Sequence, residues 1–244
     1  MTEKKYCVVL GASGGIGEAI CRELASSGWS LYLHYNTNVL QVKHLWAELT
    51  KAYPQADFQI VQADFSALDG AELLAAQVRH VSAIIVANGQ SIVKLLTETT
   101  GADMDALWKV HMQNPALFIS LISSQLRKFN KSYIVFIGSI WGNTGAAGEV
   151  MYSAVKGAQH AFVKAYAKEV AFSGTRVNAV APGWIETSMN SVISPDDRQV
   201  VIDEIPLMTT GTPEHIAEAV TFLVGGKADY MTGEIMKVNG GWYI

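Results

Sequence analysis

Three polar residues near the middle of the chain have the types and spacing needed for proton transfer to a carbonyl oxygen. Tyr152 and Lys156 are four residues apart, so they share one face if their segment is helical. A cation beside a phenol favours the phenolate, so we expect it to lower a tyrosine pKa that is ordinarily about 10. Ser139 ends a strand-like run, and its hydroxyl can bond the same substrate oxygen. Together these groups can exchange a proton with a ketone or an alcohol.

A glycine-rich segment near the start of the chain predicts a second chemistry, the binding of a pyrophosphate. Gly11-Ala-Ser-Gly-Gly-Ile-Gly17 follows a strand-like run and opens a helix-like one. Glycines let the backbone approach phosphates closely, and a helix N-terminus offers unpaired N–H groups to their charge. An ordinary glycine-rich turn is the alternative, and the flanking strand and helix disfavour it. The residues expected to bind the cofactor here are Gly11, Ser13, Gly14, Gly15, Ile16 and Gly17.

The elements that must position these residues alternate along the whole chain. Short apolar runs between amphipathic helices predict a parallel sheet covered on both faces. We therefore expect an α/β, doubly wound, Rossmann-like architecture with one domain over 1–244 and a substrate loop at about 184–212. Strands are predicted at 6–10, 31–35, 58–63, 83–87, 133–137, 176–181 and 235–238, and helices at 15–27, 40–53, 67–78, 103–128, 152–172 and 213–224.

Composition narrows the classes of partner. Eighteen basic and 22 acidic residues give a net charge of −4, so neither nucleic acid nor an anionic membrane is expected as a partner. Cys7 and Cys21 lie in segments expected to be buried, and nothing indicates a disulfide framework. The six histidines show no metal-ligand spacing, so no metal is expected. No signal-like or bilayer-spanning apolar run is present, which favours a cytoplasmic protein.

Taken jointly, the motifs resemble the short-chain dehydrogenase/reductase family. The resemblance rests on Gly11-x-x-x-Gly15-x-Gly17, Ser139, Tyr152-x-x-x-Lys156, Pro182-Gly183 and Asn239-Gly-Gly, and it covers essentially the whole chain. It implies that Tyr152 donates the proton in reduction, that Lys156 binds the nicotinamide ribose, and that Ser139 polarises the carbonyl. It further implies cofactor contacts from Asp64 and Phe65, Asn88 and Gly89, Pro182 and Gly183, and Ile185 and Thr187. For Asp64, a cap of the following helix is an equally good interpretation.

Some positions depart from the family pattern. Leu10 stands where the family usually has threonine, and Val86-Ala87-Asn88-Gly89 matches its Asn-Asn-Ala-Gly only in part. His111 stands where the fourth catalytic residue, an asparagine, is expected. A histidine can still bond a backbone carbonyl or a water there, so a catalytic role and a structural role for His111 both remain open.

The end of the second strand bears on the choice of nicotinamide. A carboxylate there would grip the ribose hydroxyls and repel a 2′-phosphate. The chain has Tyr35, Asn36, Thr37 and Asn38 there instead, with no acid to repel a phosphate. Asn36, Thr37 and Asn38 could donate to it, and Tyr35, Asn36 and Thr37 are expected to contact the cofactor. Relatives that use NADPH often carry arginine at the position of Gly14, which this chain does not. We expect NADP(H), with NAD(H) as the alternative.

The substrate is less constrained than the reaction. The chain resembles 3-oxoacyl-[acyl-carrier-protein] reductases throughout, which implies a small or carrier-linked ketone. The chain also resembles bacterial elongation factor P 5-aminopentanone reductases. This narrower resemblance rests on Ser139-Ile-Trp-Gly-x-Thr-Gly-Ala146, Glu149-Val150, Lys156-Gly-Ala-Gln-His160 and His111. Ser173 replaces an arginine that acyl-carrier reductases present to their carrier.

Other features remain open at this point. Trp141 and Trp184 are predicted to line the substrate pocket, although Trp141 could equally be a core aromatic. A non-catalytic dinucleotide sensor is a further alternative, and the intact Ser139, Tyr152 and Lys156 argue against it. The two long helices carry apolar residues on more than one face, so a homotetramer is expected.

Overall fold

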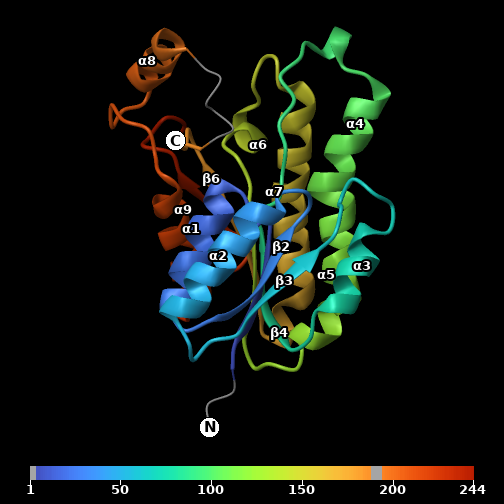
Figure 1. The fold of residues 1–244 in the computed structure, drawn as a ribbon. Helices are drawn as coiled ribbons and strands as arrows, with labels where there is room; N and C mark the ends of the chain where they lie inside the picture. The colour runs from blue at the N-terminus through green and yellow to red at the C-terminus, as the bar shows by residue number, and fades with distance from the viewer. Residues whose placement is uncertain (1–3, 188–193) are drawn as a thin grey trace.

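A single parallel sheet organises the protein. The computed structural model describes residues 4–187 and 194–244, and the strands in this part of the chain form one seven-stranded sheet in the order β3-β2-β1-β4-β5-β6-β7 (Figure 1). The order reverses between β1 and β4, as in a doubly wound fold. The predicted single α/β domain is confirmed. The strands are β1 (Tyr6–Leu10), β2 (Ser30–Tyr35), β3 (Phe58–Gln62), β4 (Val81–Val86), β5 (Ser132–Ile137), β6 (Thr175–Pro182) and β7 (Ile235–Val238).

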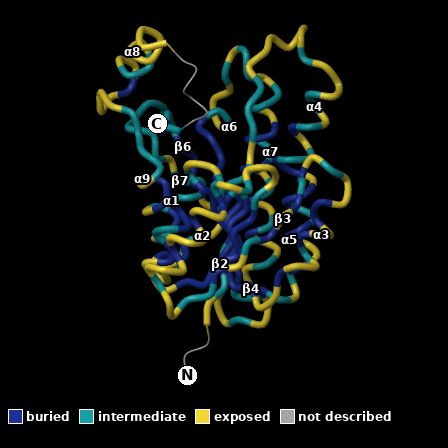
Figure 2. Tube along the Cα trace, viewed as in Figure 1, coloured by how far each residue is buried: buried dark blue, intermediate teal, exposed yellow. Residues whose placement is uncertain are grey.

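Helices cover both faces of the sheet, which explains why the strands are continuously apolar. Side chains alternate along β1: Cys7 and Val9 pack under one helical layer, and Val8 and Leu10 under the other. Burial is densest along the strands and falls outward through the helices (Figure 2). One layer holds α1 (Gly15–Ser26), α2 (Val39–Ala52) and α9 (Pro213–Val224), and the other holds α3 (Gly70–Gln77), α4 (Gly101–Trp108), α5 (Asn114–Leu126) and α7 (Val150–Val170) (Figure 1).

The helix predicted over 103–128 is not continuous. A π-helical turn, Lys109–Gln113, separates α4 from α5. Pro115 explains the break, because its ring lacks an N–H and clashes with the carbonyl four residues earlier, that of His111. The freed backbone oxygens find side-chain donors: Asn88 donates to the Val110 carbonyl at 2.7 Å and Gln159 to the His111 carbonyl at 2.8 Å.

The segment predicted as a substrate loop at about 184–212 contains a helix, and its residues 188–193 lie outside the part of the chain that the structure describes. Its role in binding substrate stays a prediction. Helix α8 (Pro195–Glu204) begins after Ser194, whose hydroxyl accepts a hydrogen bond from the Asp197 N–H at 3.1 Å. A short parallel bridge joins Ile185 to Gly211 at the base of the segment. With α6 (Trp141–Thr144), α8 stands at the carboxyl ends of the strands (Figure 1).

Two short 3-10 turns, Leu96–Glu98 and Ala171–Ser173, complete the described elements. Within residues 4–187 and 194–244, no helix combines the length and apolarity that a bilayer crossing needs. Cys7 and Cys21 are buried free thiols, as their segments predicted.

Candidate active site

The structure brings Ser139, Tyr152 and Lys156 together at the carboxyl ends of β5 and β6. The Lys156 ammonium lies 5.5 Å from the centre of the Tyr152 ring, so the two side chains share a face of α7 as predicted. Ser139 lies close enough to the Tyr152 phenol to act against the rise of its pKa. Lys156 also donates to the Ile137 carbonyl at 2.9 Å, which ties α7 to the end of β5. A phenol, a hydroxyl and an amine thus meet at one point.

The electrostatics of the pair differ from the expectation. Burial, and then the charge of Glu149, raises the pKa of Tyr152 well above its usual value, and the Ser139 hydrogen bond opposes this only in part. Burial also lowers the pKa of Lys156 to about 7. A buried lysine that is only partly protonated near neutral pH offers its neighbour a weak field. The tyrosine is therefore held in its protonated form, which suits a proton donor.

His111 lies beside this group and is buried. Its ring meets the Tyr152 ring edge-on, with 5.7 Å between centres. Its Nε2 lies 2.8 Å from the Gln90 carbonyl oxygen, and burial lowers its pKa to about 3. A Cβ on Gly89 would approach the His111 ring to 2.8 Å, so the glycine makes room for the imidazole. A neutral His111 packed on Tyr152 can orient the phenol, and a catalytic role for His111 stays a prediction.

His160, one turn after Lys156, is a site residue that the sequence analysis quoted only as part of a motif. The Gly138 N–H donates to the Val180 carbonyl at 2.8 Å, and a Cβ on Gly138 would lie 2.5 Å from His160 Nε2. A Cβ on Gly142 would come within 2.7 Å of the same ring. The histidine therefore fills the space behind the Ser139 segment, which only glycines on both sides allow.

Replacing Gly138 with alanine is expected to lower the free energy of unfolding by about 1–3 kcal/mol, because the new methyl group overlaps the buried His160 ring. His160→Ala removes the overlap, so the double variant should be more stable than the sum of the single changes implies. Urea unfolding of the wild type, the two single variants and the double variant measures this coupling. Strictly additive changes would contradict the proposed contact.

The glycine loop opens α1 with the geometry that a pyrophosphate needs. Gly11 has φ +78°, and a Cβ there would lie 2.7 Å from the Asn88 Cα. A Cβ on Gly17 would lie 2.1 Å from the Gly11 carbonyl oxygen, so the tight turn excludes any side chain. No side chain caps the helix at Gly14, and Gly14 and Gly15 are exposed. The free N–H groups of the first turn are thus open to an anion.

His34 fixes this loop and was not singled out from the sequence. Its Nδ1 accepts a hydrogen bond from the Gly11 N–H at 3.1 Å, and its Nε2 lies 3.1 Å from the Ala63 carbonyl oxygen. This pattern requires a neutral ring that accepts at Nδ1 and donates at Nε2, and burial lowers its pKa to about 4. The signal in the sequence was a histidine inside an otherwise apolar strand.

The residues expected to meet the adenosine end lie together beyond β2 and β3. Asn36 donates to Asp64 Oδ1 at 3.1 Å, and the same oxygen accepts from the backbone and the hydroxyl of Ser66 at 2.8 and 2.7 Å. Asp64 therefore closes a local turn and does not cap α3, which begins at Gly70. Phe65 is buried, and its ring packs beside that of His34 with 5.1 Å between centres.

The segment after β6 folds over the glycine loop. A Cβ on Gly15 would lie 3.3 Å from Thr187 Cγ2, which places Thr187 against the first turn of α1. Gly183 packs on Asn239, where a Cβ would meet its neighbour at 2.8 Å. Pro182 ends β6 and Ile185 is buried. The segment after β6 and the glycine loop therefore lie side by side, and a dinucleotide fits the open start of α1 and the tight glycine turn before it.

Comparison with known proteins agrees with this arrangement. The family model described as Enoyl-(Acyl carrier protein) reductase matches residues 11–243. The uncharacterized oxidoreductase YmfI of Bacillus subtilis is 43% identical over 242 residues, which cover 98% of this chain and 99% of the relative. The 3-oxoacyl-[acyl-carrier-protein] reductase FabG of Aquifex aeolicus is 34% identical over 245 residues, which cover 98% of this chain and 97% of the relative. The chain belongs to the short-chain dehydrogenase/reductase family.

Solved structures share the fold over its full length. A putative NAD(P)-dependent gluconate 5-dehydrogenase from Beutenbergia cavernae with bound NADP superposes with a TM-score of 0.91 at 26% identity, covering 99% of this chain and 97% of that one. A blue fluorescent protein from a metagenomic library in complex with NADPH gives a TM-score of 0.90 at 26% identity, covering 98% of each chain.

In this short-chain dehydrogenase/reductase, Trp141 does not lie in the sheet core. Its ring centre lies 5.2 Å from that of Trp242 and 5.4 Å from that of Tyr243, both edge-on. Its backbone N–H donates to Ser139 Oγ at 3.1 Å. The C-terminal residues Trp242 and Tyr243 are thus brought to the side of Ser139. The sequence analysis missed both, because only the tertiary fold returns the chain end to this site.

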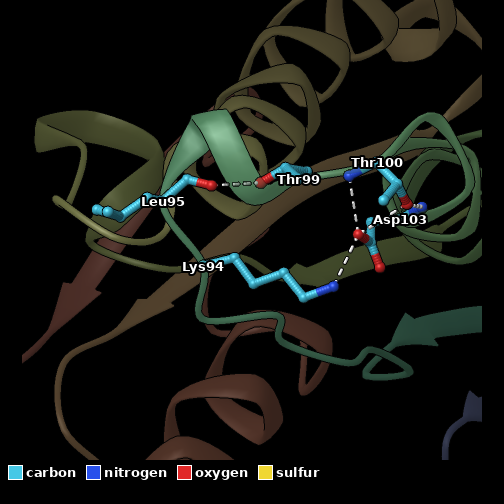
Figure 3. A network of polar contacts seen from close by, with 5 residues as sticks. All are labelled: Lys94, Leu95, Thr99, Thr100 and Asp103. Atoms are coloured by element: carbon cyan, nitrogen blue, oxygen red, sulfur yellow. Dashed lines mark hydrogen bonds and ion pairs between the residues drawn. The ribbon is translucent and has the colours of Figure 1, made fainter.

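One rim of the site is the loop between β4 and α4. Lys94 pairs with Asp103 at 2.9 Å, and Thr100 donates to the same carboxylate from its backbone and hydroxyl (Figure 3). These contacts lower the pKa of Asp103 to about 2. The Lys94 N–H donates to the Gly148 carbonyl at 2.8 Å, which ties the rim to the segment before Tyr152.

The rim opposite to this loop includes α8. The Trp242 indole N–H donates to Glu204 at 3.1 Å, and Arg198 pairs with Glu186 at 2.7 Å. The predicted substrate residue Trp184 lies at the base of the same segment, where its carbonyl accepts from the Gly211 N–H at 2.9 Å.

Proposed function

We propose that this oxidoreductase reduces a ketone to a secondary alcohol, with Tyr152 as proton donor. The observation that carries the proposal is the meeting of Tyr152, Ser139 and Lys156 at the carboxyl ends of the strands, the same edge of the sheet as the glycine loop. The glycine loop at the start of α1 would hold the pyrophosphate of a bound dinucleotide, and Ser139, Tyr152 and Lys156 would adjoin its nicotinamide end.

The chain's own residues have distinct parts in the proposed mechanism. Ser139 donates a hydrogen bond to the substrate oxygen and holds it against Tyr152. Tyr152, kept protonated by burial, transfers its proton to that oxygen as negative charge develops there. Lys156 binds the nicotinamide ribose, and His111 holds the Tyr152 ring from the side. The reduced nicotinamide, when bound, supplies the hydride.

We propose NADP(H) as the cofactor and NAD(H) as the alternative. Asn36 and Thr37 are exposed just beyond β2, and no carboxylate precedes them there to repel a 2′-phosphate. The similar structures that hold NADP or NADPH support the same choice. Tyr35, at the end of β2, is partly buried and lies beside them.

Two substrates are proposed. The first is a 3-oxoacyl thioester, supported by the similarity to FabG. The second is the 5-aminopentanone modification of elongation factor P, supported by the aromatic cluster at Trp141 and by Ser173, whose short hydroxyl bonds to Val170 and Thr175 and offers an acidic carrier no positive charge. Both proposals place the reaction in the cytoplasm. A homotetramer remains a prediction, and the exposed apolar Leu121 and Phe172 are consistent with contact between copies.

The proposal predicts NADPH oxidation by the purified protein in the presence of a ketone, with NADPH preferred over NADH. Acetoacetyl thioester and aminoketone-modified elongation factor P are assayed in parallel by absorbance, with each nicotinamide. The variant Asn36→Asp serves as the matched probe of the cofactor, because its carboxylate should repel the 2′-phosphate and shift the preference toward NADH. A wild-type preference for NADH would reverse the cofactor assignment, and no turnover of either ketone would refute the function.

A further inference from the structure

The direction in which the Ser139 hydroxyl points depends on one backbone group. Ser139 Oγ accepts a hydrogen bond from the Trp141 backbone N–H at 3.1 Å. A hydroxyl has one proton to donate, and an N–H donor on its oxygen leaves that proton free for a substrate oxygen. The Trp141 N–H therefore orients Ser139 as a donor. The proposed mechanism needs this orientation, because Ser139 must meet the same oxygen as Tyr152.

The Trp141 N–H belongs to α6, a helix of only four residues. A helix this short is not stable in isolation, because its few hydrogen bonds do not offset the cost of nucleation. Tertiary contacts must therefore hold it. One contact comes from α7, where His160 Nδ1 lies 2.8 Å from Asn143 Oδ1. The other comes from the end of the chain, where the Trp141 ring packs edge-on against Trp242 and Tyr243, with 5.2 and 5.4 Å between centres.

The end of the chain is itself fixed. Asn239 cross-links the turn, because its Oδ1 accepts a hydrogen bond from the Gly241 N–H at 3.0 Å and its Nδ2 donates to the Tyr243 carbonyl at 2.8 Å. Gly240 has φ +63°, and its carbonyl accepts a hydrogen bond from the Leu207 N–H at 3.1 Å. Chain ends are ordinarily poorly ordered unless they are tied down in this way. The turn can therefore support a neighbouring element.

Trp242 joins this turn to both α6 and α8, which lie on either side of the chain end in the view of Figure 1. Its indole N–H donates to Glu204 of α8 at 3.1 Å. Its ring lies against the rings of Trp141 and Tyr243, the latter with 5.3 Å between centres. A continuous series of contacts thus runs from α8 through Trp242 and Trp141 to Ser139 Oγ.

We propose that Trp242 is a positioning residue for Ser139: its ring fixes Trp141, whose backbone N–H directs the serine hydroxyl toward the substrate oxygen. This inference rests on the proposed function, in which Ser139 donates to that oxygen. Without the ring, α6 loses one of its supports and the hydroxyl adopts other orientations. The effect falls on the chemical step and spares NADPH binding, because the glycine loop lies at the start of α1.

Single-turnover oxidation of NADPH tests the proposal, with acetoacetyl thioester or aminoketone-modified elongation factor P as the ketone, whichever the wild type reduces faster. We expect Trp242→Ala to lower the rate by at least about tenfold and to leave the affinity for NADPH within about twofold of the wild-type value. In the Ser139→Ala background the same change should have less than about a twofold effect, because no hydroxyl remains to be positioned. Trp242→Phe keeps a ring against Trp141 and should restore most of the rate. An equal loss of rate in both backgrounds would overturn the proposal.

Amide hydrogen exchange at Trp141, followed by NMR, judges the same contact without turnover. The Trp141 N–H should exchange at least about tenfold faster in Trp242→Ala than in the wild type, because its bond to Ser139 Oγ opens more often. Trp46→Ala is the matched control, since Trp46 lies on α2 and its indole N–H also makes a hydrogen bond, to the Phe58 carbonyl at 2.9 Å. The control should leave both the rate and the Trp141 exchange at their wild-type values.

The outcomes separate this inference from the proposed function. Unchanged exchange at Trp141 would overturn the inference even if the rate fell. If circular dichroism shows that Trp242→Ala does not fold, Trp242→Leu takes its place with the same expectations, because leucine keeps apolar bulk and lacks the ring. Failure of the wild type to reduce either ketone would refute the proposed function alone, and the exchange measurement would still decide whether Trp242 holds the Trp141 N–H on Ser139.

Discussion

Tyr152→Phe is expected to lower kcat by about 10³-fold while leaving the affinity for NADPH close to that of the wild type. The change deletes only the phenol oxygen, so the proton for the substrate oxygen must come from water. The ring that packs edge-on against His111 is retained, and Lys156 keeps its bond to the Ile137 carbonyl. Single-turnover measurement of NADPH oxidation reports the chemical step, and fluorescence titration reports cofactor binding.

A second tyrosine on the same helix provides the control. Tyr166 packs against Phe162, with 5.4 Å between ring centres, and lies 14 residues beyond Tyr152, about 21 Å along the helix axis. Tyr166→Phe should retain full activity. A Tyr152→Phe protein that turns over at the wild-type rate would show that another group donates the proton.

Lys156→Met is expected to stabilise the cofactor-free protein by about 2 kcal/mol at neutral pH while removing activity. Burial moves the pKa of Lys156 from 10.5 to about 7, and each pH unit corresponds to about 1.4 kcal/mol. Losing the hydrogen bond to the Ile137 carbonyl offsets part of this gain. The expected gain arises because Lys156 serves the reaction, while its burial lowers the free energy of unfolding of the wild type.

The sign of the pH dependence follows from the lowered pKa. Between about pH 7 and 10.5 the unfolded chain binds more protons at this lysine than the folded one, so wild-type stability rises with pH. The advantage of Lys156→Met should therefore be full below about pH 7 and shrink toward pH 10.5. Urea unfolding at about pH 6 and about pH 9 measures it. Lys164→Met, an exposed lysine on the same helix, should change stability by less than about 0.5 kcal/mol at both pH values. A variant less stable than the wild type at the lower pH would contradict the assignment.

The sequence alone predicted the order of the seven strands and the gathering of Ser139, Tyr152, Lys156 and the glycine loop at their carboxyl ends. The hydrophobic periods of two residues for a strand and 3.6 for a helix are local properties of the sequence. Parallel strands buried on both faces appear as short apolar runs, independently of the rest of the fold. Since the carboxyl ends of such strands share one edge, Ser139 and the glycine loop had to lie along the same crevice. The i, i+4 spacing placed Tyr152 and Lys156 on one helix face for the same local reason.

The tertiary structure decided what depends on neighbours distant in the chain. Whether Lys156 lowers the pKa of Tyr152 depends on how deeply the two groups are buried. In this fold, burial lowers the pKa of Lys156 and raises the pKa of Tyr152. The His34 tautomer, the fit of His160 between two glycines, and the return of Trp242 and Tyr243 to Trp141 all require packing between segments far apart in the sequence. Motif spacing determines which groups are available for chemistry, and desolvation, set by the whole fold, determines their charge.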